Sequence, residues 1–129
     1  MLQDARFFAN TRAPDLDAAQ ESYEQKLGLR LISRREFGGG HGELQFDAGG
    51  GTLCIEQGEA IPHPGTPVSW EVDDVTAAVE ELRSRGIVFE EYDLPSVKTV
   101  DGIATMGPYV AAWFKDPAGN VLGVHQWSA

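Results

Sequence analysis

The chain has 129 residues, with 10 Lys and Arg against 20 Asp and Glu, which gives a formal net charge of −10. That length fits one domain, or two small modules that share a core. The excess of acid argues against nucleic acid and anionic lipid as partners, because both require a basic surface. No apolar run reaches the ~18–20 residues of a membrane span, and the single Cys54 cannot form an internal disulfide. We therefore expect no nucleic-acid partner, no membrane association and a reducing cytoplasm.

The first half of the chain alternates between strand and helix patterns. Residues 6–12 form a short predicted strand that ends near Pro14, and Asp15 is a candidate N-cap for a helix that ends at Gly28. The apolar positions at helical spacing within it are Leu16, Ala19, Tyr23 and Leu27. Three strands follow, at residues 29–37, 43–47 and 52–57, with glycine-rich turns between them. The order is βαβββ.

The second half repeats this order after a linker at residues 59–66. Residues 68–72 alternate as a strand, and Asp74 caps a helix that ends at Gly86. Strands are expected at residues 87–92, 109–115 and 121–127, with an irregular stretch at 93–106. The predicted fold class is α+β, with two tandem βαβββ modules, residues 1–58 and 67–129, in a single domain over residues 1–129.

Several motifs match one known family. They are Asp15 followed by the LGL run at 27–29, VDDV at 72–75, and FKDPAGNVL at 114–122. With these motifs the sequence resembles the vicinal oxygen chelate superfamily, which includes glyoxalase I, bleomycin-resistance proteins and extradiol dioxygenases. The resemblance implies a curved mixed sheet around a cleft, and a homodimer.

The resemblance also indicates where a metal would be bound. Enzymes of this superfamily hold a divalent metal on imidazole and carboxylate ligands. The matching positions here are Phe8, Pro67 and Gly123, with Glu56 or Cys54 as the fourth. Three of these four positions offer no donor atom, so we expect no metal and no cofactor. A relocated site made of His41, Glu43, Glu56 and His125 remains open.

Strand alternation then selects the side chains that face the predicted cleft. For strand 109–115 the choice of face depends on the hairpin register, and we favour Trp113 inward. Aromatic rings there would stack on planar ligands, Glu56 and Glu71 would favour a positive group, and Gly123 would leave room. Alternatively, Glu71 forms an ion pair and His125 is a hydrogen-bonded residue at a strand end. The predicted ligand-binding residues are Phe8, Asn10, Cys54, Glu56, Ser69, Glu71, Tyr109, Trp113, Gly123 and His125.

Three functions compete on this evidence. The first is a metal-independent protein that binds a small molecule, a cationic or planar aromatic compound such as an antibiotic. The second is a lyase or isomerase, like a glyoxalase or dioxygenase, that acts on a small metabolite without metal or with a relocated metal. General acid–base catalysis would then fall to Glu56, Glu71 or His125. The third is an interaction module that only dimerises. Residues 93–107 are the best candidate for a flap, and Cys54 is either a nucleophile or an inert buried thiol.

Overall fold

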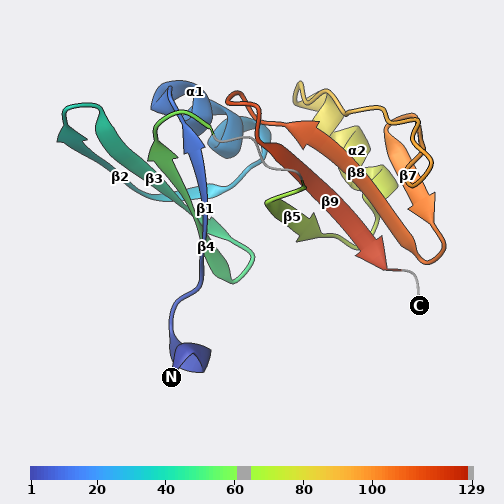
Figure 1. Cartoon of the computed structure of the whole chain (residues 1–129), viewed down its shortest axis with the longest axis horizontal. Coiled ribbons are helices and arrows are strands. Elements are labelled where there is room, and N and C mark those ends of the chain that lie inside the picture. The colour runs from blue at the N-terminus through green and yellow to red at the C-terminus, as the bar shows by residue number, and fades with distance from the viewer. Residues whose placement is uncertain (61–64, 128–129) are drawn as a thin grey trace. The chain divides into compact units, whose positions relative to one another are not determined.

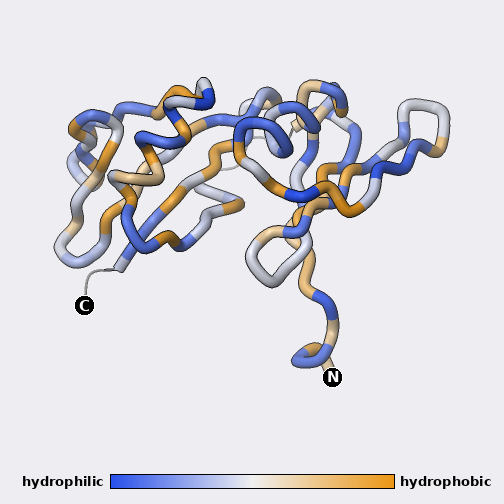
Figure 2. Tube along the Cα trace, turned by 180° about the vertical axis from the view of Figure 1, so that it is seen from behind, coloured by the Kyte–Doolittle hydropathy of each residue, from blue (hydrophilic) through white to orange (hydrophobic). Residues whose placement is uncertain are grey.

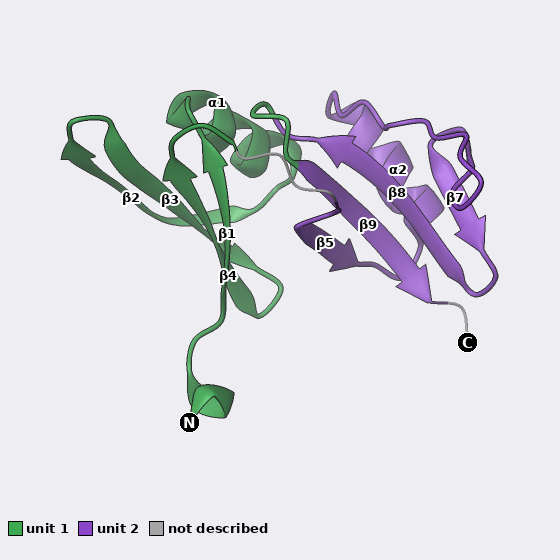
Figure 3. Ribbon diagram, in the orientation of Figure 1, with its two compact units in different colours: residues 1–62, 117–120 green, residues 63–116, 121–129 purple. Residues whose placement is uncertain are grey.

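The computed structural model describes residues 1–60 and 65–127. The chain divides into two compact units, residues 1–62 with 117–120, and residues 63–116 with 121–129 (Figure 3). The strands form a four-stranded sheet and a five-stranded sheet, each accompanied by a helix. The predicted α+β class is confirmed. Residues 61–64 of the predicted linker lie outside the described residues.

The first unit contains a mixed sheet with the strand order β1-β4-β3-β2 (Figure 1). Strands β1 and β4 are parallel, and the other neighbours are antiparallel. A short 3-10 helix, η1, precedes the sheet, and the helix α1 with its continuation η2 connects β1 to β2. The bounds are η1 Leu2–Asp4, β1 Phe8–Ala13, α1 Leu16–Gln20, η2 Glu21–Lys26, β2 Arg30–Gly38, β3 His41–Ala48 and β4 Gly51–Gln57.

The predicted helix begins where its cap was expected. The Asp15 carboxylate accepts a hydrogen bond from the backbone N–H of Ala18 at 3.1 Å. After α1 the turns widen into the π-helix η2, in which the N–H of Leu27 donates to the carbonyl of Ser22. The wider turns bring both Ser22 and Tyr23 to the buried side. Gly28 ends the helix with a φ of +73°.

The core of the first unit lies between the sheet and this helix. Tyr23 stacks on Phe46 with ring centroids 5.6 Å apart, and Phe46 is fully buried. Leu44, Leu53 and Ile55 are buried on the same face of the sheet. The opposite side, which we call the far face of the first sheet, carries the alternate residues. They are Phe8, Asn10 and Arg12 of β1, Glu43 and Gln45 of β3, and Cys54 and Glu56 of β4.

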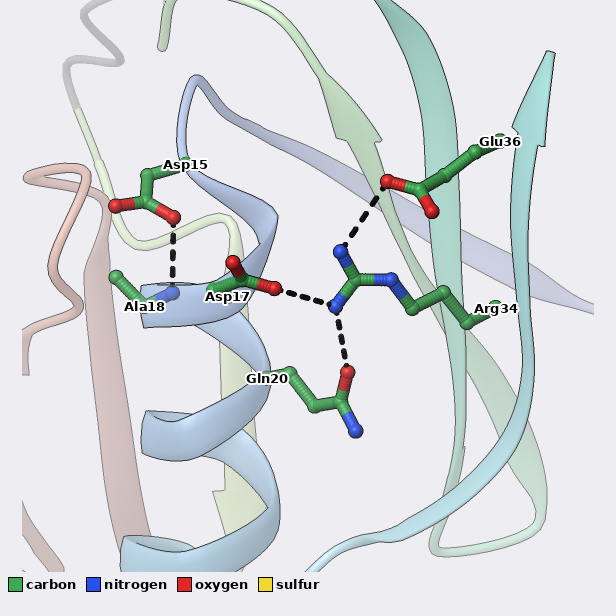
Figure 4. Close-up of polar contacts among 6 residues, drawn as sticks. All are labelled: Asp15, Asp17, Ala18, Gln20, Arg34 and Glu36. Atoms are coloured by element: carbon green, nitrogen blue, oxygen red, sulfur yellow. Dashed lines mark hydrogen bonds and ion pairs between the residues drawn. The ribbon is translucent and has the colours of Figure 1, made fainter. Parts of the chain in front are cut away.

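Arg34 ties strand β2 to helix α1. Its guanidinium donates to Gln20 at 2.8 Å, and it pairs with Asp17 at 2.9 Å and Glu36 at 3.3 Å (Figure 4). The Glu36 hydrogen bond and the Asp17 carboxylate raise the pKa of Arg34, which therefore stays charged. Because Asp17 and Glu36 are largely exposed, the two ion pairs are surface interactions, and the Gln20 hydrogen bond adds a third contact between β2 and α1.

The second unit repeats the plan with the strand order β5-β9-β8-β7-β6. Helix α2 begins behind Asp74, whose carboxylate accepts from the N–H of Ala77 at 3.1 Å. Val75 and Val79 of α2 pack toward β8 and β9, where Phe114 and Leu122 are buried. The bounds are β5 Val68–Glu71, α2 Val75–Ser84, β6 Thr99–Val100, β7 Ile103–Met106, β8 Tyr109–Lys115 and β9 Val121–Trp127.

Two predicted segments of this unit are different in the structure. Residues 87–92, expected as a strand, make only an isolated bridge between Phe89 and Phe114, because β7 pairs with the other half of β8. The stretch 93–106, expected to be irregular, contains β6 and β7. The turn between these strands is Asp101-Gly102, with φ values of +51° and +78°. Asp-Gly is a strong sequence signal for a two-residue hairpin turn, and it explains why this stretch is not irregular.

Figure 2 shows hydrophobic and hydrophilic segments interspersed along the chain in both units. Within the described residues, no helix has the length and apolar character needed to cross a membrane.

Candidate functional site

The far face of the second sheet, opposite α2, carries six of the predicted residues. Ser69 of β5, Gly123 of β9 and Trp113 of β8 are neighbours in one row across the three strands. Glu71 and His125 are partners in the next row. Tyr109 has the same parity on β8 as Trp113. The hairpin register therefore places Trp113 and Tyr109 on the same face as Gly123 and His125.

A hollow of about 320 Å³ opens beside Trp113. Tyr92 forms its second aromatic wall, with ring centroids 5.7 Å apart and an edge-to-face angle of 66°. The volume is at the lower end of the ~300–1,000 Å³ typical of small-molecule sites. The hollow is lined by Gly65, Thr66, Tyr92, Leu94, Val97, Trp113 and Val121, all from the second unit. None of these lining residues is charged, so the hollow offers aromatic and aliphatic surface with one phenol.

One wall of the hollow is an ordered hairpin over residues 92–99. Leu94 and Val97 exchange two backbone hydrogen bonds around its tip, and the N–H of Thr99 donates to the carbonyl of Tyr92. Glu91 fixes the base, because one of its oxygens accepts from Thr99 Oγ1 and from the N–H of Gly102, both at 2.7 Å. The predicted flap is thus a braced hairpin that places Leu94 and Val97 against the hollow.

Tyr92 is held in its neutral form. Burial raises the pKa of the Tyr92 phenol, and the nearby Glu90 carboxylate raises it further, while Lys115 acts in the opposite direction. Lys115 and Glu90 form an ion pair at 3.3 Å. The phenol therefore stays protonated near neutral pH and can donate a hydrogen bond to a ligand.

A second group on this face surrounds His125. Its Nδ1 lies 2.7 Å from Ser69 Oγ, and its ring stacks on Tyr109 with centroids 5.6 Å apart. Tyr109 also contacts Trp127, whose side chain is largely exposed. The imidazole is therefore fixed on both its edge and its face. From sequence, His125 was either a ligand-binding residue or a hydrogen-bonded residue at a strand end. The observed geometry matches the second alternative.

The far face of the first sheet carries a polar network around Glu43. One Glu43 oxygen accepts from Gln45 Nε2 at 3.1 Å, and the other accepts from the Cys54 thiol at 3.4 Å. Arg35 approaches the same carboxylate at 3.8 Å. Cys54 is 4% exposed. Burial above all, then the Glu43 carboxylate, raises the pKa of Cys54 to about 12. The thiol is therefore a poor nucleophile.

Glu56 belongs to a different hollow from Trp113. It is the direct cross-strand neighbour of Glu43 and lines a space of about 320 Å³ with Phe37, His41, Gly42, Glu43 and Gln57, all in the first unit. Among the acidic residues, only Glu56 and Glu71 were predicted to face the cleft. In the structure Glu43 lies beside Glu56 on the same sheet face. Alternation along β3 would have predicted this if the pairing register of β3 had been known. Phe8 and Asn10 lie on this same sheet face, at the β1 edge.

The donor atoms present do not fit a divalent metal of the kind the superfamily implies. Phe8, Pro67 and Gly123 offer no side-chain ligand at the matching positions. In the described parts of the chain, residues 1–60 and 65–127, no three His, Cys, Asp or Glu side chains are grouped so that they could hold a metal ion. The relocated set that includes His41 and His125 gains no support from this arrangement.

The sequence alone missed the hairpin side of the aromatic hollow. Tyr92, Leu94 and Val97 were placed in a strand end and an irregular stretch, although all three line the hollow. The signal that could have located them is the Leu94-Pro95-Ser96-Val97 turn beside the Asp101-Gly102 hairpin.

Comparison with known families agrees with this fold. The model of the Glyoxalase/Bleomycin resistance protein/Dioxygenase superfamily matches residues 8–124. The chain belongs to this superfamily. A comparison with curated proteins gives no match.

Solved structures share the fold over nearly the whole chain. SMU.1112c is 24% identical, with 95% of this chain and 98% of that chain covered and a TM-score of 0.71. A glyoxalase/bleomycin resistance protein/dioxygenase from Alicyclobacillus acidocaldarius is 19% identical, with 98% and 93% covered and a TM-score of 0.68. TnmS3, an antibiotic binding protein from Streptomyces sp. CB03234, is 23% identical, with 97% and 98% covered and a TM-score of 0.60. At these identities the likeness concerns the fold.

Proposed function

We propose that this chain is a small-molecule binding protein that takes up a planar aromatic compound in the Trp113–Tyr92 hollow. The observation that carries the proposal is the pair of aromatic walls around a space of about 320 Å³ that aliphatic side chains complete. Flat ring systems gain both apolar burial and stacking in such a site. An antibiotic-binding role of the kind named for TnmS3 fits this chemistry.

A positive charge on the ligand has weaker support than its planarity. None of the described residues that line the hollow is acidic, and the nearby Glu90 is paired with Lys115. Attraction of a cation therefore rests on the overall charge of −10, a long-range effect that salt screens over ~8 Å at physiological ionic strength. We expect a planar cation to bind more tightly than a planar anion, by a margin that shrinks as salt is added.

The experiment is a titration with proflavine, a planar tricyclic cation, and with anthraquinone sulfonate, a planar anion, followed by calorimetry. Trp113→Ala is expected to weaken the binding of both probes about tenfold or more, because a stacking face and its burial are lost. Trp127→Ala is the matched control, since Trp127 is 65% exposed and does not line the hollow. Equal losses in the two variants, or none in Trp113→Ala, would contradict the proposal.

A second candidate function is a metal-free lyase or isomerase. The observation in its favour is the 2.7 Å contact between Ser69 Oγ and His125 Nδ1, which orients an imidazole beside Glu71 on the same sheet face. A fixed imidazole can act as a general base on a carbon acid. Deuterium exchange next to the carbonyl of small keto compounds, followed by NMR, tests this role. Exchange that is lost in His125→Gln supports it, and an equal rate in both proteins counts against it.

The proposal includes a homodimer in the reducing cytoplasm. This part rests on the exposed apolar side chains Leu2, Phe7 and Phe37 of the first unit, which a second copy would cover. Light scattering after size exclusion should give twice the mass of the chain. A monomeric mass at micromolar concentration would refute this part and leave the ligand site unaffected.

A further inference from the structure

Gly123 is a strand residue whose missing side chain has a specific neighbour. A Cβ built at this position would lie 3.1 Å from Trp113 Cδ1, 3.3 Å from the carbonyl oxygen of Ala112 and 3.4 Å from Ser69 Oγ. The first distance is tighter than nine in ten real Cβ contacts, so the indole would have to move by a few tenths of an ångström. The glycine has an ordinary φ, so its backbone does not demand glycine. Glycine is favoured here because the Trp113 indole lies against this position and leaves little space for a Cβ.

The space left by Gly123 is therefore occupied by protein. From sequence, Gly123 was predicted to leave room for a ligand, but the Trp113 indole lies against this position. Trp113 and Gly123 are direct neighbours in the β8–β9 ladder, and Tyr92 meets the indole from the opposite strand edge. The indole thus lies against Gly123 of β9 and also contacts the Tyr92 ring edge to face.

We propose that Gly123 is the positioning residue that sets the pose of Trp113, and so determines which ligands the hollow accepts. This inference rests on the proposed function for its ligand: flat ring systems that stack on the indole. A Cβ at position 123 shifts the indole by a few tenths of an ångström away from β9 and toward the hollow, and a larger side chain shifts it further. The Ala112 carbonyl is backbone and cannot yield cheaply, so the side chain of Trp113 is the group that moves.

The first test needs no ligand. In a chain with Trp70→Phe and Trp127→Phe, Trp113 is the only tryptophan left. Gly123→Ala is expected to shift its emission to longer wavelength and to raise its quenching by acrylamide, and Gly123→Val should do so more strongly. Gly51→Ala is the matched control, because Gly51 also lies in a strand with an ordinary φ and its Cβ would meet its nearest neighbour at 3.4 Å. Spectra of Gly123→Ala that match the parent would overturn the inference.

The second test uses proflavine as the probe. Gly123→Val is expected to weaken its binding about tenfold, because the displaced indole would take up part of the hollow. In a Trp113→Ala background the same change should alter binding less than about twofold, because the group that is displaced has gone. Equal losses in both backgrounds would overturn the inference. If Gly123→Val does not fold, Gly123→Ala replaces it in the same cycle.

The two tests separate the inference from the proposed function. If proflavine and anthraquinone sulfonate do not bind at all, the proposed function fails while the fluorescence of Trp113 still judges the role of Gly123. If binding depends on Trp113 but not on the residue at position 123, the proposed function stands and the inference fails.

Discussion

Cys54 should be almost unreactive in the folded protein. Burial and the Glu43 carboxylate raise the pKa of its thiol to about 12, against ~8.5 for an ordinary cysteine. Near pH 8 an ordinary thiol is about one quarter ionised, whereas at most about one Cys54 in ten thousand carries a thiolate. The thiolate is the reacting species, so its population falls by about three orders of magnitude.

The loss of rate is smaller than the loss of thiolate. A thiolate of higher pKa is intrinsically more nucleophilic, with a Brønsted coefficient of ~0.4–0.5. This recovers about one and a half orders of magnitude, which leaves a net slowing of about thirty- to a hundredfold. Steric shielding adds to this figure, because Cys54 is only 4% exposed.

The assay is the reaction of the folded chain with a chromogenic disulfide reagent, with the chain in guanidinium chloride as the reference. Glu43→Gln should speed the reaction of the folded chain several-fold, because it removes the negative charge that accepts a hydrogen bond from the Cys54 thiol, with Sγ and Oε2 3.4 Å apart. Glu56→Gln is the matched control, since Glu56 makes the smallest of the contributions that raise the pKa of Cys54.

Two results would refute this reasoning. A folded rate within about threefold of the unfolded rate would show that the thiol ionises normally. A larger acceleration in Glu56→Gln than in Glu43→Gln would show that the hydrogen bond to Glu43 is not the governing contact. The pH profile gives a third check, because the folded rate should still be rising at pH 10, where an ordinary thiol has reached its plateau.

Three further predictions concern stability. Asp15→Ala and Asp74→Ala should each lower the free energy of unfolding by about 1 kcal/mol while Asn at either site should not, as measured by urea denaturation. Arg34→Ala should cost about 1 kcal/mol in the same assay, because the ties to α1 are lost, and Arg34→Lys should recover only part of it. As the pH rises, the Cys54 thiol ionises in the unfolded chain before it ionises in the folded chain. The stability linked to this thiol is therefore intact below about pH 8.5 and is lost as the pH rises toward 12, so Cys54→Ser should flatten the alkaline fall in Tm. An unchanged slope in Cys54→Ser would contradict the pKa.

The fold was predictable because its signals are local. Asp15 and Asp74 each precede an apolar helical pattern, and each caps its helix in the structure. Alternation along β4 placed Cys54 and Glu56 on one face of the sheet, and in the structure they share the face opposite the buried Leu53 and Ile55. Strand 109–115 was harder, because its two faces are both apolar and only the pairing with β9 decides between them.

The candidate site was less predictable because it depends on long-range pairing. Tyr92 meets Trp113 only because residues 89–90 lie beside β8, a contact that no local pattern announces. The same applies to Glu43, whose position opposite Glu56 follows from the β3–β4 register. Sequence alternation assigns a residue to a face but does not say which neighbours share its row.

Gly123 shows why an absent side chain is difficult to interpret from sequence. A glycine in a strand leaves a gap in the row of side chains, and from sequence that gap looks like room for a ligand. Close packing leaves few such gaps empty in a folded protein, so a neighbour usually fills them. Here the neighbour is the largest side chain in the row, Trp113. Gly123 therefore contributes to binding by fixing the position of the Trp113 indole. A larger residue at position 123 should make the hollow smaller.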